Sequence, residues 1–493
     1  MAWQDRGKVT SNPQVLRDQY NSKLVSAAEA VKGIKSDNDV VVAFGVAETP
    51  ILLDAMADRK EELRDVRIHQ MIPMRPSKYL QPGMEKHFSH VSWFTSGASR
   101  NGVQTGRFDI MPNYFYLSPR LFAEYIEVDI LMATVSPMDK FGFFSFGASI
   151  DYTTTVAQKA KKIMLVVNPN MPRTHGNTFI HVTQTDYLVE DDSPLPELPS
   201  KDMGPEDLAI GQHVAELVED GSTLQLGIGK IPNAVAQALL TKQNLGIHSE
   251  ILTDGMVDLM EAGAVTNNAK SIHFGKSLAC AALGTKRLYD FINDNPMFEL
   301  HPVSYTNNPN TIGKNIKMVS INATVEVDLL GQCASETIGP IQYSGTGGQV
   351  DFVRGAVQAP GGKAFIVLHS TVKNKSKIVP MFREGTVITT SKNDVDYIVT
   401  EYGVAKLSGR TFKQRAEALI NIAHPDHRPE LREAAKKWAC FRRINKKGLL
   451  LRTIKFASQQ PFAVFLVMTS SATMMMMMML MSAAAATAHW ASY

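Results

Sequence analysis

The segment at 220–254 constrains the fold of this chain more than any other stretch. It reads DGSTLQLGIGKIPNAVAQALLTKQNLGIHSEILTD. The pattern predicts four consecutive elements: a strand at 223–226, a glycine turn at 227–229, a helix entered at Pro232 and a second strand at 246–252. A glycine-rich turn before a helix gathers free backbone N–H groups around a small volume, which suits anions and developing oxyanions.

The second predicted strand delivers one carboxylate, Glu250. If the two strands are neighbours in one sheet, both finish at the same carboxyl edge, where open α/β sheets bind ligands. Backbone donors and a nucleophilic carboxylate would then meet. The alternative is a tight turn followed by a solvated acid, and spacing alone does not separate the two. His248 lies two residues earlier, on the same strand face, and nothing further indicates that it acts as a base.

Three pairs of segments indicate an internal repeat. They are GVAETP at 45–50 with GIGKIP at 227–232, IEVDIL at 126–131 with VEVDLL at 325–330, and TVAQKAKKIMLVVN at 155–168 with GAVQAPGGKAFIVLH at 355–369. The pairs occur in the same order at an offset of about 200 residues, as expected for duplicated units. We therefore predict two related, open α/β halves in which short buried strands alternate with helices, giving mostly parallel sheets.

The predicted domain organisation follows from this repeat and from a proline-rich, acidic interruption. It comprises an N-terminal α/β domain at 1–189, a linker at 190–207, a C-terminal α/β domain at 208–440 that carries Glu250, and an atypical tail at 441–493. A chain of 493 residues is long enough for two or three domains. The active site is expected at the interface between the two α/β domains.

Composition excludes several classes of protein. A net charge of +3 gives no electrostatic footprint for nucleic acid, so no nucleic-acid partner is expected. The three cysteines are isolated, which argues against a disulfide framework and a CxxC metal site. The first residues carry no secretory or transit pattern, so we expect a cytoplasmic protein.

A second glycine cluster, SGTGGQVDF at 344–352, follows the repeat segment at 325–330. Glycine permits close approach of backbone, so this loop either lies against a ligand or the 227–229 turn, or is a flexible surface loop. The matching place in the first half, FGFFSFGAS at 141–149, is richer in aromatic residues. Only the second half is therefore expected to carry the chemistry.

Several ordered motifs together resemble the acetyl-CoA hydrolase/transferase family, and within it the 4-hydroxybutyrate and butyrate:acetate CoA-transferases. They are GIGKIPNAV at 227–235, HSEILTDG at 248–255, INA at 321–323 with EVD at 326–328, GTGGQVDF at 345–352 and TEYGVA at 400–405. The resemblance extends over about 13–436. It implies a CoA-transferase-like pair of α/β domains.

The resemblance also implies a ping-pong transfer of CoA between a short-chain acyl-CoA and a free carboxylate, with Glu250 as the nucleophile that becomes a glutamyl-CoA thioester. No cofactor is expected to be bound permanently, because acyl-CoA and small carboxylic acids are the substrates. No metal is expected, and a homo-oligomer is. The residues expected to contact CoA are Gly227, Ile228, Gly229, Lys230, Ile231, Asn322, Gly347, Gly348 and Lys373.

Further candidates carry an open alternative. Lys375 is a second candidate for the CoA phosphates, and Glu401 either orients a positive group or is an exposed acid at a strand-to-helix junction. The segment at 90–122 is expected to face the site, with Ser99, Asn101 and Pro112 as candidate lining. For Trp93 and Phe115 within it, an ordinary aromatic core is the alternative.

Two questions stay open. The apolar run at 462–486 follows a basic stretch and has the length of a tail anchor, but its methionine and alanine runs favour a low-complexity or artefactual end, so no membrane association is expected unless the anchor is genuine. For function, an acyl-CoA hydrolase would use the same glutamate, and a non-catalytic or sugar-phosphate-binding α/β protein would use the glycine turn alone.

Overall fold

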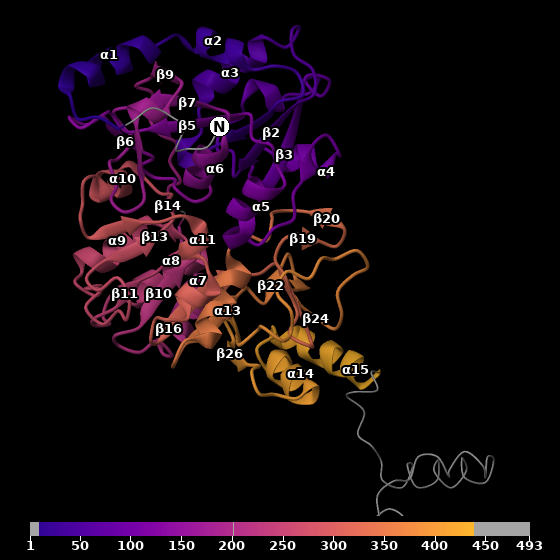
Figure 1. Ribbon diagram of the computed structural model, residues 1–493. Helices are drawn as coiled ribbons and strands as arrows, with labels where there is room; N and C mark the ends of the chain where they lie inside the picture. Colours follow the sequence, from indigo (N-terminus) through magenta and orange to yellow (C-terminus); the bar gives the residue numbers. More distant parts are fainter. Residues whose placement is uncertain (1–8, 201, 438–493) are drawn as a thin grey trace, which may run out of the picture. The chain divides into compact units, whose positions relative to one another are not determined.

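The computed structural model describes residues 9–200 and 202–437, and its first half is built on a parallel sheet of seven strands. The strand order is β4-β3-β2-β1-β5-β7-β9 (Figure 1). The bounds are β1 (Asp39–Val42), β2 (Val66–Met71), β3 (Phe88–Phe94), β4 (Asp109–Ile110), β5 (Ile130–Val135), β7 (Lys162–Val167) and β9 (Tyr187–Glu190). All six pairings are parallel.

The second half contains a six-stranded sheet in the order β11-β10-β16-β21-β25-β26. Its strands are β10 (Thr223–Leu226), β11 (Gly246–Ile247), β16 (Met318–Ala323), β21 (Lys363–Val367), β25 (Tyr397–Thr400) and β26 (Gly403–Lys406). Only the β25–β26 hairpin is antiparallel in this sheet. The predicted fold class, two related α/β units with mostly parallel sheets, is confirmed.

Helices connect most of these strands. In the first half they are α1 (Pro13–Lys23), α2 (Ala27–Ala30), α3 (Pro50–Asp58), α4 (Arg100–Gln104), α5 (Ser118–Glu124) and α6 (Thr153–Lys159). In the second half they are α7 (Pro205–Ala215), α8 (Lys230–Ala238), α9 (Asp254–Glu261), α10 (Lys286–Ile292), α11 (Val303–Thr306), α12 (Pro309–Ile312), α13 (Gln349–Gln358), α14 (Phe412–Asn421) and α15 (Arg428–Lys437). Within the described ranges, none of these helices has the length and apolar character needed to cross a membrane.

Short strands form further small sheets beside the two large ones. They are β6 (Phe143–Ser145) with β8 (Phe179–His181), β12 (Ile251–Leu252) with β14 (Ala281–Ala282), β13 (Ser277–Ala279) with β15 (Phe298–Leu300), β17 (Glu326–Asp328) with β18 (Cys333–Ala334) and β24 (Ile378–Val379), β19 (Thr337–Ile338) with β20 (Ile341–Gln342), and β22 (Thr371–Val372) with β23 (Lys375–Ser376). Several of them flank the site described below.

The strand order confirms the internal repeat. The series β2-β1-β5-β7-β9 in the first sheet corresponds to β11-β10-β16-β21-β25 in the second. Two of the predicted sequence pairs fall on equivalent elements: the turn and helix after β1 and β10, and the helix and strand α6–β7 and α13–β21. The third pair is wrong, because 126–131 leads into the central strand β5 whereas 325–330 contains β17 of a side sheet.

One predicted element is interrupted. The expected strand at 246–252 divides into β11 and β12, which pair in different sheets, with a bend between them at Glu250. Helix α1 ends at Lys23, and Val25 N–H then donates to the Leu188 carbonyl at 2.9 Å, which draws the chain against β9. The tail at 441–493 lies outside the described residues.

The first sheet is buried on both faces. Val40 and Val42 of β1 point to a cluster that contains α3 side chains, whereas Val41 points to a second cluster on the opposite face. This second cluster continues into the other half, where it includes Leu224 and Ile321. Because apolar burial contributes about 25 cal/mol per Å², this shared core ties the halves together, and residues up to Ala435 form one compact unit.

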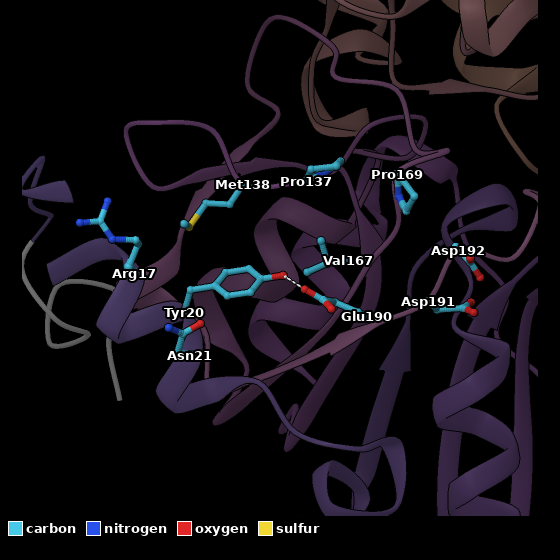
Figure 2. A pocket seen from close by; sticks show the side chains of 10 residues that line it. All are labelled: Arg17, Tyr20, Asn21, Pro137, Met138, Val167, Pro169, Glu190, Asp191 and Asp192. Atoms are coloured by element: carbon cyan, nitrogen blue, oxygen red, sulfur yellow. Dashed lines mark hydrogen bonds between the residues drawn. The ribbon is translucent and has the colours of Figure 1, made fainter. Parts of the chain in front are cut away.

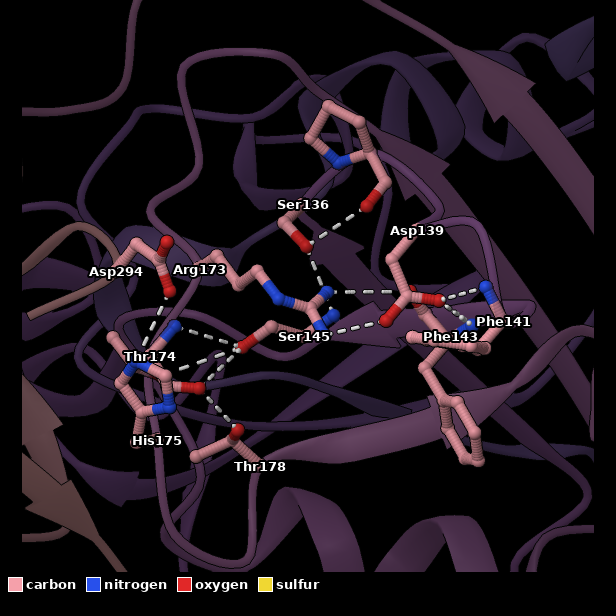
Figure 3. A network of polar contacts seen from close by, with 11 residues as sticks. Ser136, Asp139, Phe141, Phe143, Ser145, Arg173, Thr174, His175, Thr178 and Asp294 are labelled. Atoms are coloured by element: carbon pink, nitrogen blue, oxygen red, sulfur yellow. Dashed lines mark hydrogen bonds and ion pairs between the residues drawn. The ribbon is translucent and has the colours of Figure 1, made fainter. Parts of the chain in front are cut away.

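Polar contacts add to this interface. His175 of the first half pairs with Asp294 of the second half (Figure 3), and their atoms are 3.1 Å apart. Nearby, Arg173 pairs with Asp139 within the first half. Two residues after His175, Asn177 N–H donates to the Leu300 carbonyl at 2.9 Å. The loop before β8 is therefore paired by main-chain hydrogen bonds with the end of β15.

Gly176 is required at this seam. Its φ is +103°, and a Cβ built there would lie 2.3 Å from the Leu300 carbonyl oxygen. We expect Gly176→Ala to lower the free energy of unfolding by about 2 kcal/mol or more, because backbone strain and an immovable main-chain contact add. Urea denaturation would measure this loss.

Gly83→Ala is the matched control. Gly83 has a similar φ of +93°, and no atom lies within 4 Å of its added Cβ. Its substitution carries only the cost of the backbone conformation, so the free energy of unfolding should fall less than in Gly176→Ala. Equal losses in the two variants would contradict the steric account of the seam.

Candidate functional site

A cavity of about 350 Å³ opens at the carboxyl ends of β10 and β16, between the two halves. The first half contributes apolar side chains to it: Phe44, Met71, Ile72 and Phe94. The second half contributes the polar and glycine-rich lining: Gln225, Gly227, Ile228, Glu250, Asn322, Thr324, Ser335, Ser344, Gly345, Thr346, Gly347, Gly348 and Gln349. The predicted meeting of the glycine turn, Glu250 and the second glycine cluster is therefore present in the structure.

Glu250 lies in the bend between β11 and β12, outside both strands, and its side chain lines the cavity. Its backbone carbonyl accepts hydrogen bonds from Cys280 N–H and Ala281 N–H, both at 3.1 Å, which fixes the main chain. Its carboxylate accepts one from the Asn307 side-chain amide at 2.6 Å and another from Gly348 N–H. Two hydrogen bonds hold the carboxylate and two more hold its backbone, so the side chain is pre-positioned for attack.

Gly348 can only be glycine here. A Cβ at this position would lie 1.7 Å from Glu250 Oε2 and 2.4 Å from Asn307 Nδ2. The φ of Gly348 is −93°, so backbone conformation does not demand glycine. The requirement is the close approach of the 344–348 loop to the carboxylate, and this explains why the cluster is rich in glycine.

Two other carboxylates lie near Glu250. Asp151 comes from the first half, where Ser149 Oγ donates to it at 2.7 Å, and Asp351 comes from α13, where it accepts from Tyr116 N–H at 3.0 Å. Burial raises the pKa of Glu250 to about 7, and the charge of Asp151 adds to the rise while the bonds from Asn307 and Gly348 oppose it. Burial likewise raises the pKa of Asp151 to about 6 and that of Asp351 well above its usual range.

His248 is not a base for Glu250. Its ring is buried between the Thr306 carbonyl and the Asn315 side chain, each at 2.8 Å, and burial lowers its pKa to about 3. A neutral, doubly hydrogen-bonded histidine supports the backbone here. It contacts the last residue of α11, next to Asn307.

The glycine turn is formed, with one correction. Gly229, with a φ of +125°, is the N-cap of α8, as the close turn requires. Gly227 N–H, however, donates to the Ile321 carbonyl at 3.0 Å, because β10 continues pairing with β16 to that point. It cannot also serve as an oxyanion donor. Ile231 is buried in α8 and does not line the cavity.

Asn322 lines the cavity, but its side chain is committed elsewhere. Asn322 Nδ2 donates to Gln225 Oε1 at 3.0 Å, and Gln225 Nε2 donates back to Asn322 Oδ1 at 3.2 Å. This reciprocal amide pair joins the ends of β16 and β10. Asn322 therefore shapes the floor of the cavity rather than holding Glu250.

A second cavity of about 440 Å³ adjoins the first through Ile228, which lines both. Gly229, Lys230 and Asn233 line it from the turn and α8, and 198–200 line it from the predicted linker. Lys230 is exposed. Together the two cavities provide a path that leads from Glu250 past the glycine turn to a positive side chain.

Other predicted residues are not brought to these cavities. Lys373 and Lys375 lie in the β22–β23 hairpin and line neither, so a role in CoA binding stays a prediction that the cavities do not support. Glu401 begins the turn between β25 and β26, not a strand-to-helix junction, and accepts from Ser370 N–H at 2.9 Å. It holds the chain after β21.

The aromatic segment at 90–122 is divided between core and site. Phe94 lines the cavity, whereas Ser99, Asn101 and Pro112 do not. Trp93 and Phe115 are each 1% exposed, so the aromatic-core alternative is correct for both. Thr95 Oγ1 donates to the Tyr343 carbonyl at 2.7 Å, which places this segment beside the 344–348 loop.

The residues that sequence reasoning missed are those that surround Glu250 from distant segments: Asn307, Asp151 and Asp351. Asn307 follows a four-residue helix, and Asp151 comes from the other half. Asp351 had a signal, because it belongs to the GTGGQVDF motif. The other two carry no motif that spacing would reveal.

A larger cavity, of about 780 Å³, lies at the carboxyl ends of β5, β7 and β9, where the first half passes into the predicted linker (Figure 2). Tyr20 Oη donates to Glu190 there at 2.6 Å, and Asp191 and Asp192 also line it. It occupies the edge of the first sheet that corresponds to the Glu250 edge of the second. It lacks both the glycine turn and a buried, donor-held carboxylate, so we assign the candidate active site to the Glu250 cavity.

Comparisons with known proteins agree with this geometry. The chain is 52% identical over 421 residues to the succinyl-CoA:cyclohexane-1-carboxylate CoA transferase of Geobacter metallireducens, which covers 85% of this chain and 96% of that protein. It is 49% identical to the 4-hydroxybutyrate coenzyme A transferase of Clostridium kluyveri, with 85% and 98% covered.

Among solved structures, RipA from Yersinia pestis superimposes with a TM-score of 0.81 at 38% identity, covering 86% of this chain and 99% of that one. A 4-hydroxybutyrate CoA-transferase from Porphyromonas gingivalis gives 0.73 at 37% identity, covering 85% and 98%. The acetyl-CoA hydrolase/transferase N-terminal domain matches 8–199, and the C-terminal domain of the same family matches 284–435. With both domains matched in order and with relatives aligned over nearly their whole length, this chain belongs to the acetyl-CoA hydrolase/transferase family.

Proposed function

We propose that this protein is a CoA-transferase that moves CoA between a short-chain acyl-CoA and a free carboxylate, with Glu250 as the nucleophile. The observation that carries the proposal is the partly buried Glu250 carboxylate, which accepts hydrogen bonds from Asn307 and Gly348 in a cavity between the two halves. A carboxylate nucleophile suits this transfer because the anhydride that it forms stays activated toward thiolate.

The reaction proceeds in balanced steps. A Glu250 oxygen attacks the thioester carbonyl, the C–S bond breaks, and an acyl-glutamyl anhydride and CoA thiolate form. The thiolate then attacks the glutamyl carbonyl carbon, which releases the donor acid as a carboxylate and leaves a glutamyl-CoA thioester. An acceptor carboxylate reverses both steps and leaves with CoA. No proton needs to be gained or lost overall.

The donors on Glu250 stabilise the charge that develops during this sequence. When thiolate attacks the glutamyl carbonyl, negative charge builds on a Glu250 oxygen. Asn307 Nδ2 and Gly348 N–H already point at that carboxylate. Preorganised donors of this kind contribute about 3 to 4 kcal/mol each to transition-state stabilisation.

The rest of the substrate extends along the two adjoining cavities. The cavity at Glu250 takes the acyl group and thioester, and the apolar side chains Phe44, Met71 and Phe94 suit a short aliphatic acyl chain. The longer arm of CoA passes Ile228 into the cavity at Gly229 and Lys230, whose positive charge suits a phosphate. Homo-oligomerisation and a cytoplasmic location remain predictions.

Transfer is favoured over hydrolysis for two reasons. The relatives above 45% identity are named CoA transferases, whereas an acetyl-CoA hydrolase of Kluyveromyces lactis is 30% identical over 239 residues, 47% of this chain. In addition, Glu250 lies at a cavity whose first-half lining is apolar, which disfavours water beside the anhydride. The names of the relatives suggest acetate, butyrate, 4-hydroxybutyrate and cyclohexane-1-carboxylate as acceptors to test.

The direct test supplies one acyl-CoA with a panel of these acids, while new acyl-CoA and free thiol are measured in parallel. A transferase makes the acceptor's CoA ester with no net thiol, and its double-reciprocal plots are parallel. Thiol release that does not depend on an acceptor would instead establish the hydrolase. If neither a new acyl-CoA nor free thiol is formed, both the transferase and the hydrolase functions are contradicted.

Replacement of the nucleophile should abolish transfer. We expect Glu250→Gln to lower kcat/KM roughly 10⁴-fold or more, because the amide cannot form the anhydride. Glu250→Asp retains a carboxylate one methylene short, so a loss of roughly 10² is expected from misplacement. Steady-state kinetics with circular dichroism as a folding control checks both, and full activity in Glu250→Gln would refute the role of Glu250.

The close approach of the glycine loop gives a second test. We expect Gly348→Ala to lower kcat/KM roughly 10²-fold, because the added methyl group would occupy the space of the Glu250 carboxylate. Gly97→Ala is the control, since no atom lies within 4 Å of its added Cβ and its φ lies outside the left-handed region. Steady-state kinetics measures kcat/KM for both variants, and equal values would contradict the proposed packing of Gly348 against Glu250.

The pH dependence follows from the raised pKa of Glu250. Attack requires the ionised carboxylate, so the single-turnover rate at which the donor acid is released should fall tenfold per pH unit as pH drops below about 7. Asp151→Asn removes a negative charge that raises this pKa, and the midpoint should then shift to lower pH. Asp58→Asn, at an exposed ion pair with Lys78, should leave the midpoint unchanged. A midpoint unaffected by Asp151→Asn would count against the charge coupling.

A further inference from the structure

Outside the Glu250 cavity, three metal-ligating side chains converge in the second half, although no metal was expected from the sequence. His273 lies in the loop between α9 and β13, Glu299 lies in β15, and His301 follows β15 directly. Their ligating atoms all lie within 4.8 Å of one another. We propose that His273, Glu299 and His301 form a site for a first-row divalent cation, with Zn²⁺ as its best probe.

The distances suit a metal after a small adjustment. Two ligand atoms of a tetrahedral Zn²⁺ ion lie about 3.4 Å apart when each bond is about 2.1 Å. His301 Nε2 and Glu299 Oε2 are 3.6 Å apart, which already matches. His273 Nδ1 and Glu299 Oε2 are in direct hydrogen-bond contact at 2.6 Å and would separate by less than about 1 Å.

His301 provides an independent sign of a missing partner. Its Nε2 atom is buried and makes no hydrogen bond of normal length among the described residues; the Glu299 carboxylate faces it from 3.6 Å. A buried ring nitrogen without a short hydrogen bond costs free energy, and most such atoms in folded proteins are satisfied. A cation between Glu299 and the two histidines would give this nitrogen a bond.

The ligand set selects the class of cation. Two imidazoles and one carboxylate suit Zn²⁺, Fe²⁺ and similar ions, whereas Mg²⁺ and Ca²⁺ prefer oxygen ligands. The side chains of His273 and His301 are each 17% exposed and that of Glu299 is 29% exposed. The group is therefore reachable from solvent, and water can complete the coordination.

Tyr305 of α11 orients the first ligand. Its hydroxyl lies 2.8 Å from His273 Nε2, while Nδ1 of the same ring faces Glu299. When Nδ1 binds a cation, the neutral ring carries its proton on Nε2 and donates it to Tyr305 Oη. Such outer hydrogen bonds fix the tautomer and orientation of histidine ligands.

The location gives the cation a structural role. Glu299 and His301 precede α11, Tyr305 lies within it, and Asn307, which donates to Glu250, follows it directly. The α11 helix spans only four residues, too few to be stable alone. A cation on its outer side would hold 299–307 in place and thereby hold Asn307. This inference is independent of the reaction assigned to Glu250.

The test uses the full chain, freed of metal by chelation and titrated with Zn²⁺ in a calorimeter. We expect one equivalent per chain, an increase in Tm, and slower amide hydrogen exchange in peptides covering 299–307. Titration with Co²⁺ should give ligand-field absorption bands that report imidazole coordination. The same results are expected in Glu250→Gln, so failure of the proposed reaction would not affect them.

The variants separate this site from adventitious binding. Glu299→Gln keeps the size and hydrogen bonding of the side chain, and His301→Ala removes the unpartnered ring. Each should weaken Zn²⁺ binding at least 100-fold. His424→Ala disrupts a different histidine pair, His424 with His427, and should leave Zn²⁺ binding unchanged. Stoichiometric Zn²⁺ binding that persists in both ligand variants, or no binding by the wild type, would overturn the proposal.

Discussion

The candidate site depends on a partly desolvated carboxylate, Glu250, that lies near two other carboxylates, Asp151 and Asp351. Burial raises the pKa of Glu250 to about 7 from an ordinary 4.5, so the folded state prefers the protonated acid. Above pH 7 this preference costs about 3 kcal/mol of folding free energy, and the cost disappears as pH falls toward 4.5. A protein retains such a cost where the strained group has a function.

The surrounding fold supplies what keeps this acid in place. The bend between β11 and β12 presents it, α11 delivers Asn307, and the loop before α13 delivers Gly348 N–H. Asp151 arrives from the other half, so the electrostatics of the site depend on both duplicated units. A continuous apolar core joins the two units. Duplication followed by divergence thus explains why one sheet edge carries the glycine turn and Glu250 and the other does not.

Sequence reasoning reached the fold class, the duplicated strand–turn–helix units and the meeting of Glu250 with the two glycine segments, because each has a local signal. The turn after β10 requires glycine, and the motif around Glu250 is contiguous. It misjudged 325–330, because two similar short apolar segments can belong to different sheets. It could not find Asn307 or Asp151, because residues that meet only through tertiary packing have no characteristic spacing in the sequence. The histidine and glutamate cluster escaped notice for the same reason, since His273 and Glu299 are 26 residues apart in the chain.

The central claim is that Glu250 becomes covalently bound to CoA, and trapping this species tests it most directly. The protein is incubated with acyl-CoA, reduced with borohydride and mapped by peptide mass spectrometry. The account predicts that the Glu250 side chain is converted to the corresponding alcohol only when acyl-CoA is present, since borohydride reduces a thioester but not a free carboxylate. An unmodified Glu250 in a protein that turns over acyl-CoA under the same conditions would contradict it.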